Sequence, residues 1–134
     1  MRFLLAILSC IFMLNCAGTP HNTAEDECQH FDETDRQLNC YEIGIRTAIH
    51  DQFQSDIQDY AQLATTYDVI QGVKVSVTLT IEGEIEGIQL LTTSGDAFLD
   101  KFFMQTIKNA SPFPMPREEA LREQLLRFTY SLNL

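Results

Sequence analysis

The chain has 134 residues, of which 45% are hydrophobic and 21% charged, and its formal net charge is -10. These values are typical of one globular domain rather than a disordered chain. The charge argues against nucleic acid as a partner, because binding phosphates requires an excess of lysine and arginine.

The N-terminal residues are typical of a secretory signal peptide. Arg2 precedes an apolar run from Phe3 to Leu14. The run is shorter than the roughly 20 residues that a membrane-spanning helix needs. We therefore expect residues 1–15 to be an export signal.

The end of this run resembles a bacterial lipobox, in which a cysteine is lipidated and becomes the new N-terminus. The residues from Met13 to Cys16 carry the resemblance, with Asn15 where a small residue is usual. This predicts lipidation of Cys16, and ordinary cleavage after Gly18 is the alternative. Because Ala17 rather than aspartate follows the cysteine, the resemblance implies sorting to the outer membrane.

Residues 16–36 are expected to form a solvated tether. Acidic side chains are densest from Glu25 to Asp35, and few apolar groups there could offset the entropy of ordering the segment. A contact for a basic partner is the alternative.

Two cysteines are left after the signal and the lipid site, and they are 12 positions apart. An exported compartment is oxidising, so Cys28 and Cys40 are expected to form a disulfide. The alternative is a metal site with His30, although three ligands at this spacing match no standard zinc motif. We predict no metal and no other cofactor.

The folded domain is expected over residues 37–134. Its first part has one apolar stripe with helical spacing, which predicts an amphipathic helix; the stripe is Leu38, Tyr41, Ile45, Ile49, Phe53 and Ile57. The segment from Tyr60 to Gln71 shows no clear period and is expected to be a connection with one helical turn.

The period then changes to two, which predicts a β-hairpin. From Val73 to Ile81, apolar residues alternate with lysine, serine and threonine. Glu82 and Gly83 are expected to form the turn, and residues 85–93 the returning strand. Gly87 is a candidate β-bulge in that second strand.

A second helix and a proline-rich strap follow. Asp96 is a good N-cap residue for a helix with a wide apolar face, formed by Phe98, Leu99, Phe102, Phe103, Ile107 and Ala110. Three alternating prolines after it hold the chain extended. We expect this strap, with Phe113 and Met115 covering an end of the core, to lead the chain back to the sheet.

The last segment predicts a short helical turn at residues 117–124 and a strand at residues 126–134, where apolar and polar residues alternate. The expected fold class is therefore α+β. It has a small three-stranded antiparallel sheet, made of the hairpin and the C-terminal strand, packed against helices in the order α-β-β-α-β.

The run from Gly72 to Pro116, closed by a terminal strand, resembles the C-terminal domain of TonB and TolA type proteins. The resemblance lies in a hairpin that ends in Ser-Gly, a helix with a Leu-Asp pair near its start, and a proline-rich exit; the matching residues are Ser94, Gly95, Leu99, Asp100, Ala110, Pro112, Phe113, Pro114 and Pro116. It covers residues 39–134, and the helix that begins at Tyr41 resembles the first helix of the TolA domain.

The resemblance implies a non-catalytic interaction module of the Gram-negative cell envelope. Such a module accepts a strand from a periplasmic or outer-membrane protein, and serves energy transduction, transport or envelope integrity. The implied partners are a component of the Tol system or a TonB-dependent receptor. If the last strand lies at a sheet edge, the docking residues are expected to be Arg127, Thr129, Ser131 and Asn133. The tether is too short to match the long linker of TonB and TolA, which favours a lipid-anchored or free periplasmic relative.

Other functions have weaker support. The chain has no nucleophile elbow, phosphate loop or HExxH motif, so we expect no enzyme. A lipoprotein that binds a small ligand or glycan is the main alternative, but the absence of tryptophan argues against a sugar site. Sheet edges that are blunted and bind nothing are the remaining possibility.

Overall fold

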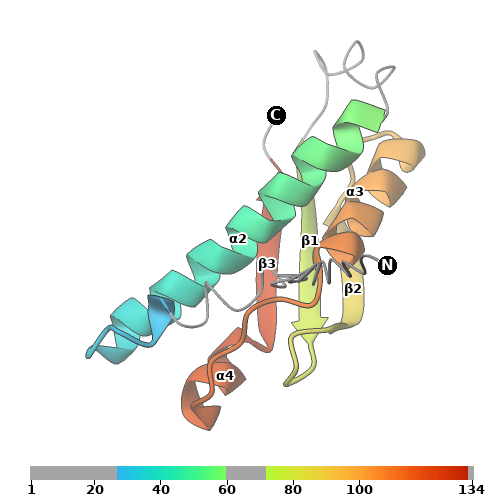
Figure 1. Ribbon diagram of the computed structural model, residues 1–134. Helices are drawn as coiled ribbons and strands as arrows, with labels where there is room; N and C mark the ends of the chain where they lie inside the picture. Colours follow the sequence, from blue (N-terminus) through green and yellow to red (C-terminus); the bar gives the residue numbers. More distant parts are fainter. Residues whose placement is uncertain (1–26, 60–71, 133–134) are drawn as a thin grey trace, which may run out of the picture.

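The computed structural model describes residues 27–59 and 72–132. Helices form one layer and a three-stranded antiparallel sheet forms the other (Figure 1). The elements are α2 (Thr34–Asp59), β1 (Val73–Leu79), β2 (Ile85–Thr92), α3 (Ala97–Ala110), α4 (Glu119–Leu125) and β3 (Arg127–Leu132). The predicted α+β fold and element order are confirmed, with α4 as the short helix before the last strand.

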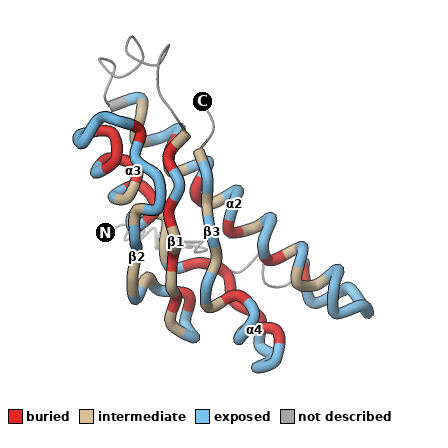
Figure 2. The backbone as a smooth tube through the Cα atoms, turned by 180° about the vertical axis from the view of Figure 1, so that it is seen from behind, coloured by how far each residue is buried: buried red, intermediate tan, exposed pale blue. Residues whose placement is uncertain are grey.

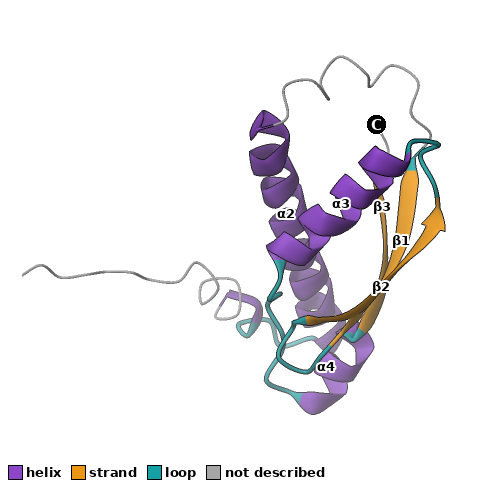
Figure 3. Cartoon of the chain, turned by 90° about the vertical axis from the view of Figure 1, so that its right-hand side faces the viewer, coloured by secondary structure: helices purple, strands orange, loops and turns teal. Residues whose placement is uncertain are grey.

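The sheet has the order β2-β1-β3, so β1 is central and the other two strands are edges. The alternating residues Val73, Val75, Val77 and Leu79 of β1 are all buried. Helices α2 and α3 cover that face of the sheet, and no helix or strand of the described residues covers the opposite face, called the open face below (Figure 3). Seen from that side, buried residues alternate along β1 with residues that are exposed or half-buried (Figure 2).

The predicted apolar stripe of α2 lies in the core, where Tyr41, Ile45, Ile49 and Phe53 are buried. The Phe53 ring packs edge-on against Phe102 and Phe103 of α3, at centroid distances of 6.0 and 6.5 Å. The fully buried Thr106 hydroxyl donates a 2.9 Å hydrogen bond to the Asp56 carboxylate. These contacts hold the two helices together across the sheet.

The predicted disulfide is present. The sulfur atoms of Cys28 and Cys40 are 2.06 Å apart, and Cys28 is 1% exposed within the core cluster. Because both sulfurs are used in this bond, the alternative metal site loses two of its three ligands. The tether was expected to extend to residue 36. In the structure Cys28 is already buried in the core, and α2 begins at Thr34.

The hairpin between β1 and β2 is confirmed, and its register is irregular in two places. One irregularity lies where Thr78 pairs with Gly87 and the next residue, Leu79, pairs with Ile85. The extra residue is Glu86, next to Gly87, where a bulge was predicted. The other leaves Leu91 as an extra residue near the end of β2, which the sequence pattern did not indicate.

The join between β2 and α3 is held by two aspartates. Asp96 caps the helix as predicted, because its carboxylate accepts from the backbone N–H groups of Phe98 and Leu99. Asp100 is 6% exposed and accepts from the hydroxyl of Thr93 and from both the N–H and the hydroxyl of Ser94, the latter two at 2.8 and 2.7 Å.

The proline strap leads from the end of α3 to α4 (Figure 1), and it contacts the hairpin turn at Gly83. Phe113 and Met115 are buried, as expected. The Phe113 N–H donates a 2.8 Å hydrogen bond to the Gly83 carbonyl. The Phe113 ring also packs edge-on against Phe128 of β3, so the strap joins the turn of the hairpin to the last strand.

Several predictions fall on residues 1–26, 60–71 and 133–134, which lie outside the described part. They are the signal peptide, lipidation of Cys16, the connection after α2, and the role of Asn133. Among the helices of the described ranges, none combines the length and the apolar character needed to cross a bilayer.

Candidate partner-binding edge

Strand β3 is held in place from its helix-facing side. Leu121 and Leu125 of α4 are buried just before the strand begins. The Tyr130 ring packs on Phe103 at 5.8 Å, and the Arg46 guanidinium of α2 lies 5.9 Å from the Tyr130 ring centroid. Burial raises the pKa of Tyr130 above its usual value, and the nearby charge of Arg46 opposes that rise. Tyr130 therefore anchors β3 as a neutral phenol.

The hydrogen bonds of β1 determine which backbone groups of β3 point outward. Leu79 donates its N–H to the Leu126 carbonyl at 2.7 Å, and these residues continue the register in which Thr78 pairs with Arg127. In an antiparallel pair, hydrogen-bonded and non-hydrogen-bonded residue pairs alternate. Phe128 and Tyr130 therefore bond to β1.

The same alternation leaves the N–H and C=O groups of Arg127, Thr129 and Ser131 directed away from β1. The pairing of β1 with β2 agrees with this assignment. Just beyond that pairing, the N–H of Thr80 donates a 2.8 Å hydrogen bond to the carbonyl of Glu84. Residues 74, 76 and 78 of β1, and residue 80 just after it, thus direct their backbone groups to β2, and the intervening residues direct theirs to β3. Within the described ranges, β3 pairs with β1 alone.

The two sheet edges differ in their regularity. The pairing of β1 with β3 runs without a shift from Val73–Leu132 to Thr78–Arg127, so the outward groups of β3 form an even row. In β2 the two register shifts interrupt the row. Bulges of this kind protect an edge against added strands. The β3 edge is therefore the better template for another strand.

The side chains beside the β3 edge are polar and include two cations. Thr129 lies opposite Ser76, Ser131 opposite Lys74, and Arg127 opposite Thr78, all on the open face of the sheet. Neither β1 nor β3 contains an acidic residue. This strip thus carries positive charge in a chain whose formal net charge is -10.

The structure brings together Arg127, Thr129 and Ser131 of the predicted docking residues, on one exposed strip of β3. Sequence reasoning missed Lys74 as their neighbour, because the pairing of the first strand with the last is not visible in local patterns. Within the described residues, no group of three or more His, Cys, Asp or Glu side chains is placed to hold a metal ion.

The chain was compared with protein families and with curated proteins. The sequence model of the TonB C-terminal family matches residues 45–129, which is more than half of the chain. The chain belongs to the TonB C-terminal family. The match begins inside α2 and ends inside β3, so it includes the whole hairpin, α3, the strap and α4. No curated protein matched the chain.

Family membership confirms the resemblance drawn from the Ser-Gly pair, the Leu-Asp pair and the proline strap. It makes the chain an interaction module of the Gram-negative cell envelope. The TonB C-terminal family is a non-catalytic interaction family, in keeping with the lack of a catalytic motif in the sequence.

Proposed function

We propose that this TonB C-terminal domain binds a periplasmic or outer-membrane protein by adding a strand of that partner to the β3 edge. The observation that carries the proposal is the outward direction of the backbone groups of Arg127, Thr129 and Ser131 along a regular edge. Main-chain hydrogen bonds supply affinity in this mode of recognition, and side-chain contacts supply specificity.

The charge of the strip suggests which strand would fit. Arg127 is exposed at the start of β3, and Lys74 is exposed beside Ser131 near its other end. A partner strand with acidic side chains on the open face would gain attraction from both cations, which speeds encounter and fixes the register. A Tol component or a TonB-dependent receptor with such a segment is the partner class we propose.

The anchoring part of the proposal rests on the sequence. Export followed by lipidation of Cys16 would hold the domain at the outer membrane, on the tether ahead of α2. The main alternative function, binding of a small ligand or glycan, gains no support from the described cavities. One of them, along α2, is an open groove with mainly apolar lining, and another, between β2 and Lys108, is open as well, whereas such a ligand needs an enclosing pocket with convergent polar groups.

Two substitutions at one position test strand addition. Thr129→Pro removes an outward N–H and should leave the bonds to β1 intact, because proline is tolerated where the N–H of an edge strand faces solvent. Thr129→Val keeps the N–H and the branched shape. A photo-crosslinking side chain at Ser131 would capture the partner in cells, with one at Gln89 on β2 as the control position.

We expect capture from Ser131 and not from Gln89, with capture preserved in Thr129→Val and lost in Thr129→Pro. The melting temperature of Thr129→Pro should stay within a few degrees of the parent, because the change removes no internal bond. Equal capture by the proline and valine variants would show that the partner does not use the β3 backbone.

A further inference from the structure

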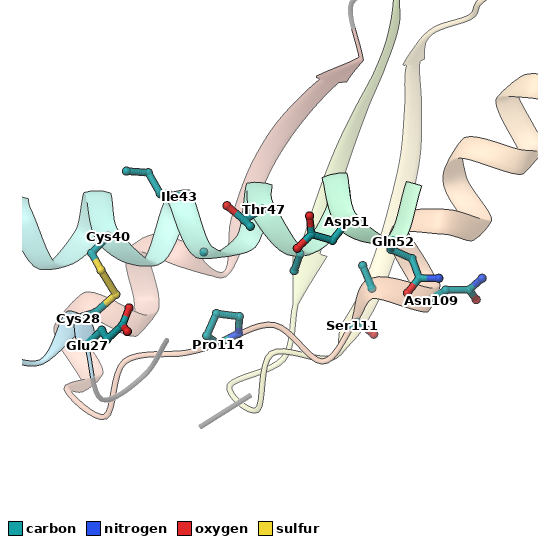
Figure 4. A pocket seen from close by; sticks show the side chains of 13 residues that line it. Glu27, Cys28, Cys40, Ile43, Thr47, Asp51, Gln52, Asn109, Ser111 and Pro114 are labelled. Atoms are coloured by element: carbon teal, nitrogen blue, oxygen red, sulfur yellow. A yellow bond between two sulfur atoms is a disulfide. The ribbon is translucent and has the colours of Figure 1, made fainter. Parts of the chain in front are cut away.

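A groove runs along the flank of α2, on a part of the surface that the proposed strand addition does not use. It is a cavity of about 670 Å³ between α2, residues 27–28, the end of α3 and the strap (Figure 4). In Figure 4 the disulfide lies at one end, Gln52 and Asn109 lie at the other, and Pro114 lies between them.

The lining of the groove is mainly apolar. The disulfide, Gly44, Ala48, Ala110 and Pro114 contribute to it. A smaller cavity of about 210 Å³ shares Cys40 and Ile43 with the groove and adds Phe31. Phe31 is 41% exposed and Ile43 is 56% exposed. The two cavities therefore form one apolar surface, and exposed large hydrophobic side chains gathered in this way mark interaction sites.

The charged side chains that line the larger cavity are both acidic. Glu27 and Asp51 line the larger cavity, and no lysine, arginine or histidine does. Arg36 lines the smaller cavity, but its guanidinium pairs with Glu33 at 3.0 Å. The side-chain amides of Gln52 and Asn109 donate hydrogen bonds to the Asp56 carboxylate, at 2.7 and 3.4 Å. The carboxylates of Glu27 and Asp51 thus face the groove without a cation among its lining residues.

We propose that this groove is a second protein-binding surface, which accepts an apolar segment of a partner flanked by lysine or arginine. The apolar lining would bury the apolar side chains of the segment, and Glu27 and Asp51 would attract its cations. An anionic lipid surface fits poorly, because the carboxylates and the formal net charge of -10 would repel it.

The groove lies on a different flank of α2 from the β3 edge. Ile43 and Thr47 line the groove, whereas Arg46 reaches the Tyr130 ring of β3. From Cys40 to Gln52 the groove follows α2 for about 18 Å, at 1.5 Å per residue. That length holds about three turns of a partner helix. One domain could therefore hold a strand at β3 and a basic, apolar segment on α2 at the same time.

The test uses a synthetic helical peptide of leucine and lysine, about twelve residues long, and the same peptide with glutamate in place of every lysine. Binding to the purified protein is measured by titration calorimetry and by NMR. We expect saturable binding of the lysine peptide, with shifts of the Thr47, Ala48 and Ala110 amides and none at Thr129 or Ser131. The glutamate peptide should not bind.

Four variants of α2 separate groove binding from general attraction to an acidic protein. Thr47→Trp fills the groove and should weaken binding at least about tenfold, a loss of about 1.4 kcal/mol, whereas Gln54→Trp, at an exposed position outside the lining, should not. Asp51→Lys should weaken binding clearly more than Glu42→Lys, which makes the same change of charge outside the groove.

Three outcomes would overturn the proposal. One is the absence of saturable binding by the lysine peptide. Another is an equal effect of Asp51→Lys and Glu42→Lys, which would reduce the binding to overall charge. The third is movement of the groove resonances with protein concentration alone, lost in Thr47→Trp, which would make a second copy of this chain the occupant.

Discussion

Gly83 is the residue at which the hairpin turn and the proline strap meet. Its φ is +82°, in the region that L-residues with a side chain rarely adopt. A Cβ there would lie 2.1 Å from the backbone oxygen of Phe113. The residue is therefore constrained twice, by its own conformation and by the strap that donates a hydrogen bond to its carbonyl.

The prediction at this scale compares two glycines. Gly95 has a similar φ of +89°, but a Cβ there would have nothing within 4 Å. Gly95→Ala should cost about 1 kcal/mol of the free energy of unfolding from backbone strain alone. Gly83→Ala should cost about 2 to 4 kcal/mol, because the strap must also move. Urea unfolding of both variants measures the difference, and equal losses would mean that the strap does not press on the turn.

Sequence patterns predicted the structural roles of some residues and gave no indication of the roles of others. Asp96 was identifiable as a cap, because short acidic side chains before an apolar helical period have few other roles. Asp100 was matched only through family resemblance, since its burial depends on Thr93 and Ser94 folding back over it. The contact of Gly83 with Phe113 joins parts of the chain that are far apart in sequence. The local spacing of apolar residues does not indicate such contacts.

At the scale of elements, Asp100 joins the end of β2 to the start of α3. Burial alone would raise the pKa of its carboxyl group, but the three hydrogen bonds from the Thr93 hydroxyl and from Ser94 outweigh burial and lower the pKa below its ordinary value. The ionised carboxylate is therefore the form that stabilises this join.

This lowered pKa gives a prediction about acid stability. The contribution of Asp100 should be fully present above the unfolded pKa of about 3.9 and lost as the pH falls toward the lower folded pKa. Asp100→Asn should reduce the free energy of unfolding by about 2 kcal/mol at pH 7. The difference in the free energy of unfolding between parent and variant, measured by urea unfolding, should decrease below about pH 4. A difference that is constant down to pH 2 would contradict this role.

The elements themselves were largely predictable, and the shape of the sheet edges was not. The strict alternation of apolar and polar residues identified β1, and the helical spacing of apolar residues identified α2, because each pattern extends over several repeats. The order β2-β1-β3 and the second bulge at Leu91 depend on pairing between strands. The α2 groove also needs residues 27–28, α2, the end of α3 and the strap to come together, so the sequence alone could not indicate it.

At the scale of the whole molecule, charge is distributed unevenly. The chain is acidic overall, yet β1 and β3 contain only basic charged residues, Lys74 and Arg127. The groove on α2 has the opposite sign, through Glu27 and Asp51. Two partners of different charge could thus be directed to different flanks of one small domain.

Anchoring is the other property of the whole molecule. If Cys16 carries a lipid, Cys16→Ser should move the protein from the membrane fraction to the soluble periplasmic fraction, while the fold stays the same. Cys10→Ser, within the signal segment, is the matched control and should leave the protein in the membrane fraction. Fractionation of cells followed by immunoblotting measures both. Persistence of the Cys16→Ser protein in the membrane would place the anchor elsewhere.

The central claim is that β3 presents an open row of backbone groups, and amide hydrogen exchange measured by NMR tests it most directly. In the free protein, the amides of Phe128 and Tyr130 should be protected by β1, while those of Thr129 and Ser131 exchange rapidly. When the cross-linked partner, or a peptide copied from its contact segment, is bound, Thr129 and Ser131 should become protected as well. Protection of these two amides in the free protein, or rapid exchange in the complex, would contradict strand addition at this edge.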